Sequence, residues 1–231
     1  MGSFDSLKQD AFTANIGLFK NGLVVATFGN VSAFDAHRGV FAIKPSGVPY
    51  DDLRQEDMVV VDLENKVVEG TLRPSSDTKT HAVLYRNFRG IGGVCHTHSS
   101  YASAWAQAKK PIPILGTTHA DHLTQDIPCT DVMSDEMILG DYETETGNQI
   151  VERFQNLSYK EIEMTLVACH GPFTWGATAQ KALYNSIMVE ELARMAYLTL
   201  RIDPAVFPLK PTLIDKHYQR KHGARAYYGQ I

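Results

Sequence analysis

Apolar residues along the chain follow two spacings, one typical of helices and one typical of strands. Residues 5–22 carry Leu7, Ala11 and Leu18 on one helical face, and Gly22 ends that pattern. The same spacing predicts further helices at 76–88, 100–110, 136–157 and 178–202, and a short helix in the tail from 213 onward. Short apolar runs predict strands at 23–28, 40–44, 58–63, 66–69, 91–98, 112–115 and 127–130, and a pair within 164–176.

Helices and short strands alternate along the whole chain, with hairpins expected around residues 64–65 and 170–172. There are no internal repeats, no low-complexity segments and no composition typical of a linker. This arrangement predicts an α/β fold with a mixed sheet, formed by residues 1–231 as a single domain.

Composition narrows the classes of function. The chain has 231 residues, 44% of them hydrophobic, and a net charge of −4, and it contains no basic block of the kind that binds nucleic acid. No apolar run reaches the length of a membrane span, and the first residues lack the features of a secretory signal. Gly2 and Ser6 fit only a short myristoylation pattern. Three cysteines argue against a disulfide framework, so we expect a cytoplasmic protein.

The segment GVCHTHSS places two histidines at the end of a predicted strand. Side chains alternate between the faces of a strand, so His96 and His98 share one face, while Cys95 and Thr97 share the other. This alternation weakens a cysteine–histidine nucleophile pair. His170 ends a second apolar strand in the same way, and three neutral imidazoles suit a divalent transition metal. Ordinary polar residues at strand ends remain the alternative.

Other polar clusters allow further chemistry. Residues 117–122 combine threonines, His119, Asp121 and His122, which fits either a catalytic loop or a capped turn. Three turns, at 28–30, 44–47 and 74–77, offer small residues, hydroxyls and backbone amides that could hold an anion. A phosphorylated substrate is therefore plausible. The glycines at 90–93 precede their strand and do not form a dinucleotide fingerprint, so a nicotinamide cofactor is excluded.

Long motifs in a fixed order give the chain a family resemblance. They are FGNVSAFD, IKPSGV, PSSDTKTH, GGVCHTHS, GTTHADH, IPCT, HGPFTWG and DKHYQRKHGARAYYGQ, and they run from residue 28 to the C-terminus. On these motifs the chain resembles the class II aldolase/adducin family, and within it the 4-epimerases of L-ribulose 5-phosphate. The resemblance implies a three-layer α/β/α sandwich with a mixed, mainly antiparallel central sheet. It also implies a homotetramer with active sites between subunits.

The resemblance further implies a reaction and a set of residues. The reaction converts L-ribulose 5-phosphate to D-xylulose 5-phosphate by cleaving C3–C4 and re-adding glycolaldehyde phosphate to a metal-held dihydroxyacetone enediolate. One Zn²⁺ per subunit, or another divalent metal, would be held by His96, His98 and His170, with Asp77 near or on it. The phosphate would be bound by Gly29, Asn30, Lys44, Ser46, Gly47, Ser75 and Ser76. Asp121 and Tyr228 would be the acid/base pair, assisted by His217.

Two positions depart from the family pattern, and a third refines the resemblance. Phe28 stands where tryptophan is usual, and His122 stands where an aromatic residue is common. Position 77 is an aspartate, as in the epimerases, where the family's aldolases have a glutamate. The resemblance therefore favours the epimerase over an aldolase acting on a sugar phosphate such as fuculose 1-phosphate. The pathway, through arabinose or through ascorbate, stays open.

Overall fold

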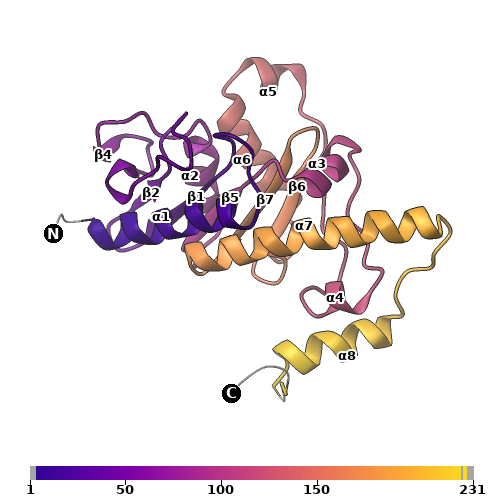
Figure 1. Ribbon diagram of the computed structural model, residues 1–231. Coiled ribbons are helices and arrows are strands. Elements are labelled where there is room, and N and C mark those ends of the chain that lie inside the picture. The colour runs from indigo at the N-terminus through magenta and orange to yellow at the C-terminus, as the bar shows by residue number, and fades with distance from the viewer. Residues whose placement is uncertain (1–3, 225, 228–231) are drawn as a thin grey trace.

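The computed structural model describes residues 4–224 and 226–227, and its helices and strands alternate along the chain (Figure 1). The helices are α1 (Asp5–Lys20), α2 (Thr78–Asn87), α3 (Ser100–Gln107), α4 (Thr117–Ala120), α5 (Asp135–Leu139), α6 (Tyr142–Arg153), α7 (Ala179–Ile202) and α8 (Pro211–His222), with a 3-10 turn at Gln55–Asp57. The strands are β1 (Asn30–Asp35), β2 (Val40–Ile43), β3 (Val59–Asp62), β4 (Val67–Glu69), β5 (Gly93–His96), β6 (Met164–Val167) and β7 (Gly171–Gly176).

The seven strands form one sheet in the order β4-β3-β2-β1-β5-β7-β6. Every neighbouring pair is antiparallel. A single parallel bridge, between Cys129 and Leu166, extends the β6 edge. The hairpins expected around residues 64–65 and 170–172 are both present. The prediction of a mainly antiparallel sheet is therefore confirmed.

Helices cover both faces of this sheet and give the predicted α/β/α sandwich. Helix α1 and the first half of α7 pack on one face, where Ala14, Ala182 and Val31 share a buried cluster. Helices α2, α3 and α6 pack on the other face, around Phe173 and Trp175. Figure 1 shows α1 and α7 lying across the front of the strands. Alternate strand residues feed the two clusters, as the pleat of a sheet requires.

Strand β5 lies near the middle of the sheet, and its side chains alternate as the sequence predicted. Cys95 is fully buried on the α1–α7 face, whereas Val94 belongs to the cluster on the opposite face. His96 stacks on Phe173, which is also on that opposite face, with ring centroids 4.1 Å apart. Cys95 therefore does not face His96, and a nucleophile pair between them is excluded.

Glycine lets α7 approach the sheet closely. A Cβ atom on Gly93 would lie 2.5 Å from the Cα of Ala179, at the first turn of α7. No side chain fits at that distance, so the backbone of β5 and the start of α7 are in direct contact. This contact fixes α7 relative to the strand that carries His96.

Some predicted elements are wrong. Residues 23–28 form no strand; the chain turns there, with Ala26 at a φ of 53°, and the central strand β1 begins at Asn30 instead. Segments 112–115 and 127–130 contribute only isolated bridges. Strand β5 ends at His96, so His98 lies beyond it. None of the helices in the described part of the chain combines the length and apolar character needed to cross a bilayer.

Candidate functional site

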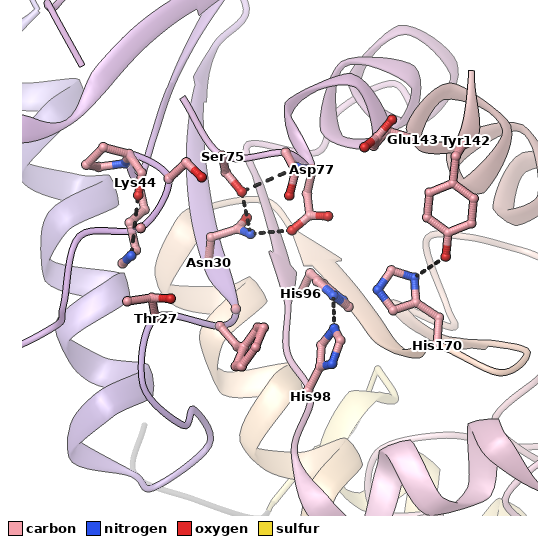
Figure 2. A pocket seen from close by; sticks show the side chains of 16 residues that line it. Thr27, Asn30, Lys44, Ser75, Asp77, His96, His98, Tyr142, Glu143 and His170 are labelled. Carbon is pink, nitrogen blue, oxygen red and sulfur yellow. Dashed lines mark hydrogen bonds between the residues drawn. The ribbon is translucent and has the colours of Figure 1, made fainter. Parts of the chain in front are cut away.

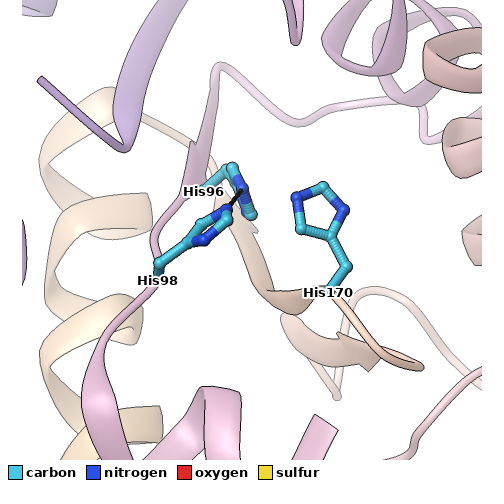
Figure 3. Close-up of side chains that lie close together, drawn as sticks. All are labelled: His96, His98 and His170. Atoms are coloured by element: carbon cyan, nitrogen blue, oxygen red, sulfur yellow. Dashed lines mark hydrogen bonds between the residues drawn. The ribbon is translucent and has the colours of Figure 1, made fainter. Parts of the chain in front are cut away.

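Three histidines converge at one end of the central strands (Figure 3). His96 ends β5, His98 follows two residues later, and His170 lies in the turn between β6 and β7. One ring nitrogen from each lies within 4.8 Å of the others. The antiparallel pairing of β5 with β7 places His96 opposite Phe173, which brings the 170 turn alongside it. The structure therefore brings together the three histidines that the sequence predicted as ligands.

Hydrogen bonding orients the ring of His96. Its Nδ1 lies 3.0 Å from the carbonyl oxygen of Pro172. A carbonyl can only accept, so Nδ1 carries a proton, and Nε2 is the ring nitrogen left to face the other histidines. That Nε2 lies 3.0 Å from the Nε2 of His98. Ligand histidines are commonly oriented by such a bond to a backbone carbonyl.

Burial favours the uncharged form of two of the three histidines, His98 and His170. It lowers the pKa of His98 and of His170, and the neighbouring His96 lowers both further. Neutral imidazoles have the electron pairs that a divalent transition metal needs. The donor set, its spacing and its protonation therefore fit such a metal.

Asp77 lies beside the histidines and is held by Asn30. The Asn30 Nδ2 donates to Asp77 Oδ2 at 2.7 Å and to Ser75 Oγ at 3.1 Å. Burial opposes ionisation of Asp77, but His96, His81 and the Asn30 amide outweigh it, so the pKa of this carboxyl lies below its usual value. Asp77 thus brings a negative charge to the same cavity, although it lies outside the compact group of three histidines.

A cavity of about 350 Å³ joins the histidines to the predicted anion-binding turns (Figure 2). Its lining includes all seven predicted phosphate-binding residues, which are Gly29, Asn30, Lys44, Ser46, Gly47, Ser75 and Ser76, together with Asp77 and the three histidines. Eleven of the fourteen residues predicted from the sequence therefore lie around one space.

The backbone of the phosphate-binding turns differs in detail from the prediction. The Ser46 amide donates to Arg73 O, and the Ser75 amide donates to Lys44 O, so neither N–H is free for an anion. These bonds join the 44–47 turn to the 73–77 turn. The serine hydroxyls and the remaining amides of the turns, rather than these two N–H groups, are the available donors.

Lys44 lies almost fully buried at the base of the cavity. Its Nζ donates to Val48 O at 2.6 Å and lies 4.8 Å from the ring centroid of Tyr50. Burial lowers the pKa of Lys44 to about 8. The lysine therefore stabilises the 44–48 turn and adds a positive charge beneath it.

Tyr142 and Glu143 also line the cavity, and neither is among the site residues predicted from the sequence. Both lie in the first turn of α6, and the Tyr142 Oη is 3.4 Å from His170 Nδ1. Segment 136–157 is predicted only as helical, and nothing in its periodicity distinguishes these two positions. These two residues reach the cavity because α6 packs on α2. That contact joins segments far apart in the sequence, so no local pattern reveals it.

The predicted acid/base residues lie elsewhere. Asp121 follows α4 and accepts from Arg220 at 2.9 and 2.7 Å, while His217 Nδ1 lies 3.0 Å from the same carboxylate. Both partners belong to α8, and Figure 1 shows α4 and α8 together, below α7. Neither Asp121 nor His217 lines the cavity. Tyr228 lies outside the described residues.

Comparison with known proteins agrees with these features. Residues 9–197 match the family model described as the class II aldolase and adducin N-terminal domain. The chain is 51% identical to the L-ribulose-5-phosphate 4-epimerase UlaF of Salmonella paratyphi B, with 97% of this chain and 98% of the relative covered. A similarly named relative from Salmonella typhi has the same identity and coverage.

Solved structures agree on the fold. An L-fuculose 1-phosphate aldolase superposes with a TM-score of 0.80 at 24% identity, covering 95% of this chain and 97% of its own. YgbL from Klebsiella pneumoniae, described as a putative aldolase/epimerase/decarboxylase, superposes with a TM-score of 0.73 at 21% identity, covering 94% and 99%. With the family model and the close relatives, these findings show that the chain belongs to the class II aldolase and adducin family.

Proposed function

We propose that the protein is a metal-dependent 4-epimerase that converts L-ribulose 5-phosphate to D-xylulose 5-phosphate. The observation that carries this proposal is the single cavity in which the three-histidine cluster faces the phosphate-binding turns. The 51% identity to L-ribulose-5-phosphate 4-epimerases over almost the whole chain supports this choice of substrate.

We propose that His96, His98 and His170 hold the metal and that Asp77 lies near it or binds it. Three protein nitrogens leave room for substrate, as in catalytic zinc sites. Zinc is the metal we propose, one per subunit, and other divalent ions suit the same donors. When bound, the metal supplies a Lewis acid for negative charge on the sugar oxygens.

We propose that the turns at Gly29–Asn30, Ser46–Gly47 and Ser75–Ser76 bind the phosphate. Their hydroxyls and remaining amides converge on the cavity, and Lys44 provides a positive charge behind them. Gly29 and Gly47 both have positive φ, at 80° and 72°, so the backbone can turn tightly around the ligand. A phosphate anchored there keeps glycolaldehyde phosphate bound while its aldehyde group rotates to present the opposite face.

The chemistry requires more than simple deprotonation. The hydrogen at C4 is not adjacent to the carbonyl, so inversion needs either oxidation and re-reduction at C4 or cleavage of the C3–C4 bond. The sequence has no nicotinamide fingerprint for the first route, so we propose cleavage and re-addition to the opposite face of the aldehyde. One group must remove the proton from the C4 hydroxyl, and a second group must protonate the new alkoxide from the other side. We assign these roles to Asp121 and Tyr228, with His217 orienting Asp121 through its 3.0 Å contact.

We propose that these acid/base groups reach the cavity of a neighbouring copy in a homotetramer. Within one chain, Asp121 and His217 form a cluster between α4 and α8 that does not line the cavity. A site between subunits would bring Asp121 and His217 of one copy to the metal- and phosphate-binding cavity of another. We further propose one domain for residues 1–231, a cytoplasmic location and a role in the use of arabinose or ascorbate.

The test is a coupled assay for D-xylulose 5-phosphate with L-ribulose 5-phosphate as substrate. We expect metal-dependent conversion, its loss in Asp121→Asn and Tyr228→Phe, and retained metal binding in both variants. Full activity in both would refute the assigned roles. Steady release of glycolaldehyde phosphate, or efficient cleavage of fuculose 1-phosphate, would instead support the aldolase alternative. The structural likeness to fuculose 1-phosphate aldolase supports only a shared fold.

A further inference from the structure

Helix α3 begins directly after the histidine segment and lacks an ordinary cap. Its N-cap is Ser99, whose side chain makes no capping hydrogen bond. The Ser99 Oγ is buried and finds no hydrogen-bond partner among the described residues. The first N–H groups of a helix have no partner within the helix and usually bond to the N-cap side chain. Another group must therefore satisfy them.

Glu190, in the middle of α7, supplies the missing cap. Its Oε1 accepts from the Tyr101 amide at 2.9 Å, and its Oε2 accepts from the Ala102 amide at 2.9 Å. These two amides are at the second and third positions of α3, where a capping side chain normally bonds. A carboxylate at this position also interacts favourably with the positive end of the helix dipole.

This contact lies three residues from His98. Strand β5 ends at His96, and the next backbone bond, from Thr97 to Pro172 O, is long at 3.4 Å. His98 is the most exposed of the three histidines; its Nε2 lies 3.0 Å from His96 Nε2, and its ring stacks on Phe28 with centroids 5.7 Å apart. The position of segment 97–99, which carries His98, is thus set by β5 at one end and by the first turn of α3 at the other.

Helix α3 has a second, independent attachment to α7. The indole Nε1 of Trp105 donates to Ala193 O at 3.0 Å, one helical turn beyond Glu190. Ala102 and Ala106 pack in the same buried cluster as Val189 and Leu192. Removing the Glu190 carboxylate would therefore leave α3 docked and release only its first turn.

We infer that Glu190 is a positioning residue that holds His98 in the geometry needed to bind the metal. The inference rests on the proposed metal site, but it assigns a role to a side chain that does not touch the cavity. The two bonds from α7 fix the start of α3, and the start of α3 fixes the backbone that carries His98. Groups that bond directly to a ligand side chain typically change metal affinity by roughly ten- to a hundredfold when removed, and Glu190, which acts through the backbone, belongs at the lower end of that range.

The experiment measures zinc affinity by chelator competition on metal-free protein, and the visible spectrum of the cobalt-loaded form, for Glu190→Ala and Glu190→Gln. We expect zinc affinity to fall roughly tenfold in Glu190→Ala. Glu190→Gln, which keeps one acceptor oxygen and the same volume, should show an intermediate loss. The cobalt spectrum should change in both variants, because His98 would coordinate differently.

Two matched variants separate positioning from general stability. Glu191→Gln removes the neighbouring carboxylate, which pairs with Arg194 on the surface at 2.7 Å, and should leave zinc affinity unchanged. Trp105→Phe loosens the far end of the same helix and should lower the melting temperature with little effect on zinc. Wild-type affinity and spectrum in Glu190→Ala would overturn the inference, even if its melting temperature fell. If Glu190→Ala does not fold, the soluble Glu190→Gln decides in the same way. Failure of the wild-type protein itself to bind zinc would overturn the proposed metal site and this inference with it.

Discussion

The ion pair between Asp121 and Arg220 should account for most of the attachment of α8 to α4. Arg220 donates to both carboxylate oxygens, at 2.9 and 2.7 Å, and the two side chains are only 15% and 24% exposed. A hydrogen bond to a charged group contributes about 1.5–3 kcal/mol net, and solvent screening at the rim reduces the sum of two. We therefore expect a coupling free energy of about 1.5–3 kcal/mol between these residues.

A double-mutant cycle of Asp121→Asn, Arg220→Met and the double variant measures this coupling. The readout is hydrogen exchange of the α8 amides at a fixed protein concentration, because attachment of one helix is a local opening equilibrium. The expected coupling corresponds to a roughly ten- to a hundredfold departure from additivity in the exchange rates of the single and double variants. A coupling below about 0.5 kcal/mol, the additivity error of such cycles, would refute the reasoning.

The same pair makes a prediction about pH. Burial acts to raise the pKa of Asp121, but the bonds from Arg220 and His217 outweigh it and hold the pKa below its usual value. A group whose folded pKa is depressed stabilises above its unfolded pKa of about 4 and loses that effect as the pH falls through the folded value. The contribution of the ionised Asp121 to protection of the α8 amides, measured against Asp121→Asn, should therefore be present at pH 7 and be lost only below about pH 4.

Three further predictions concern the cavity. His170→Ala should abolish tight zinc binding, measured by chelator competition, with an unchanged far-ultraviolet circular dichroism spectrum. Gly29→Ala should lower the free energy of unfolding by about 1–3 kcal/mol and raise KM, because φ is 80° and the new Cβ would lie 2.8 Å from Val24 Cγ1. Urea unfolding measures the first effect, and an unchanged urea midpoint would contradict it. Lys44 has a folded pKa of about 8, below its unfolded value of about 10.4, so the unfolded state binds more protons between those values. Wild-type stability relative to Lys44→Met should therefore rise from pH 8 to pH 10, and a flat difference in urea midpoints would contradict this.

Most of the fold follows from local patterns in the sequence. Helices with a clear apolar face, such as α7, and hairpins with an obvious turn, such as β3–β4, were predicted close to their observed bounds. Strand β1 was missed because NVSAFD mixes polar and apolar residues; it becomes a strand through its partners, β2 and β5. The preceding apolar run at 23–28 has strand composition but no partner strand, and Leu23 instead packs in the buried cluster on the α1–α7 face of the sheet.

The histidines were predictable because each lies at the end of an apolar strand, and strand ends that pair in one sheet meet in space. Glu190 could not be found in this way. It lies on a long helix among the charged residues Glu191 and Arg194, and its sequence context is that of an exposed surface. Its contact with the Tyr101 amide spans 89 residues and depends on how α7 lies across β5.

The two halves of the proposed site are built differently, and the difference bears on assembly. The histidine half depends on strand pairing and the buried faces of the sheet, so one chain can form it alone. The half around Asp121 depends on α8, whose described residues are all at least partly exposed and which meets α4 chiefly through charged and polar groups.

A carboxylate whose pKa is held down by Arg220 is a poor proton acceptor. Activity as a general base would therefore require the bonds from Arg220 to Asp121 to weaken, for example through a substrate oxygen that competes for the guanidinium, when Asp121 reaches the cavity of a neighbouring copy. On this reasoning, Arg220→Met should raise the lower pKa of the kcat/KM profile toward the ordinary value for aspartate, while Asp121→Asn should abolish that limb. An unchanged profile in Arg220→Met would indicate that Arg220 and Asp121 separate in the assembled enzyme.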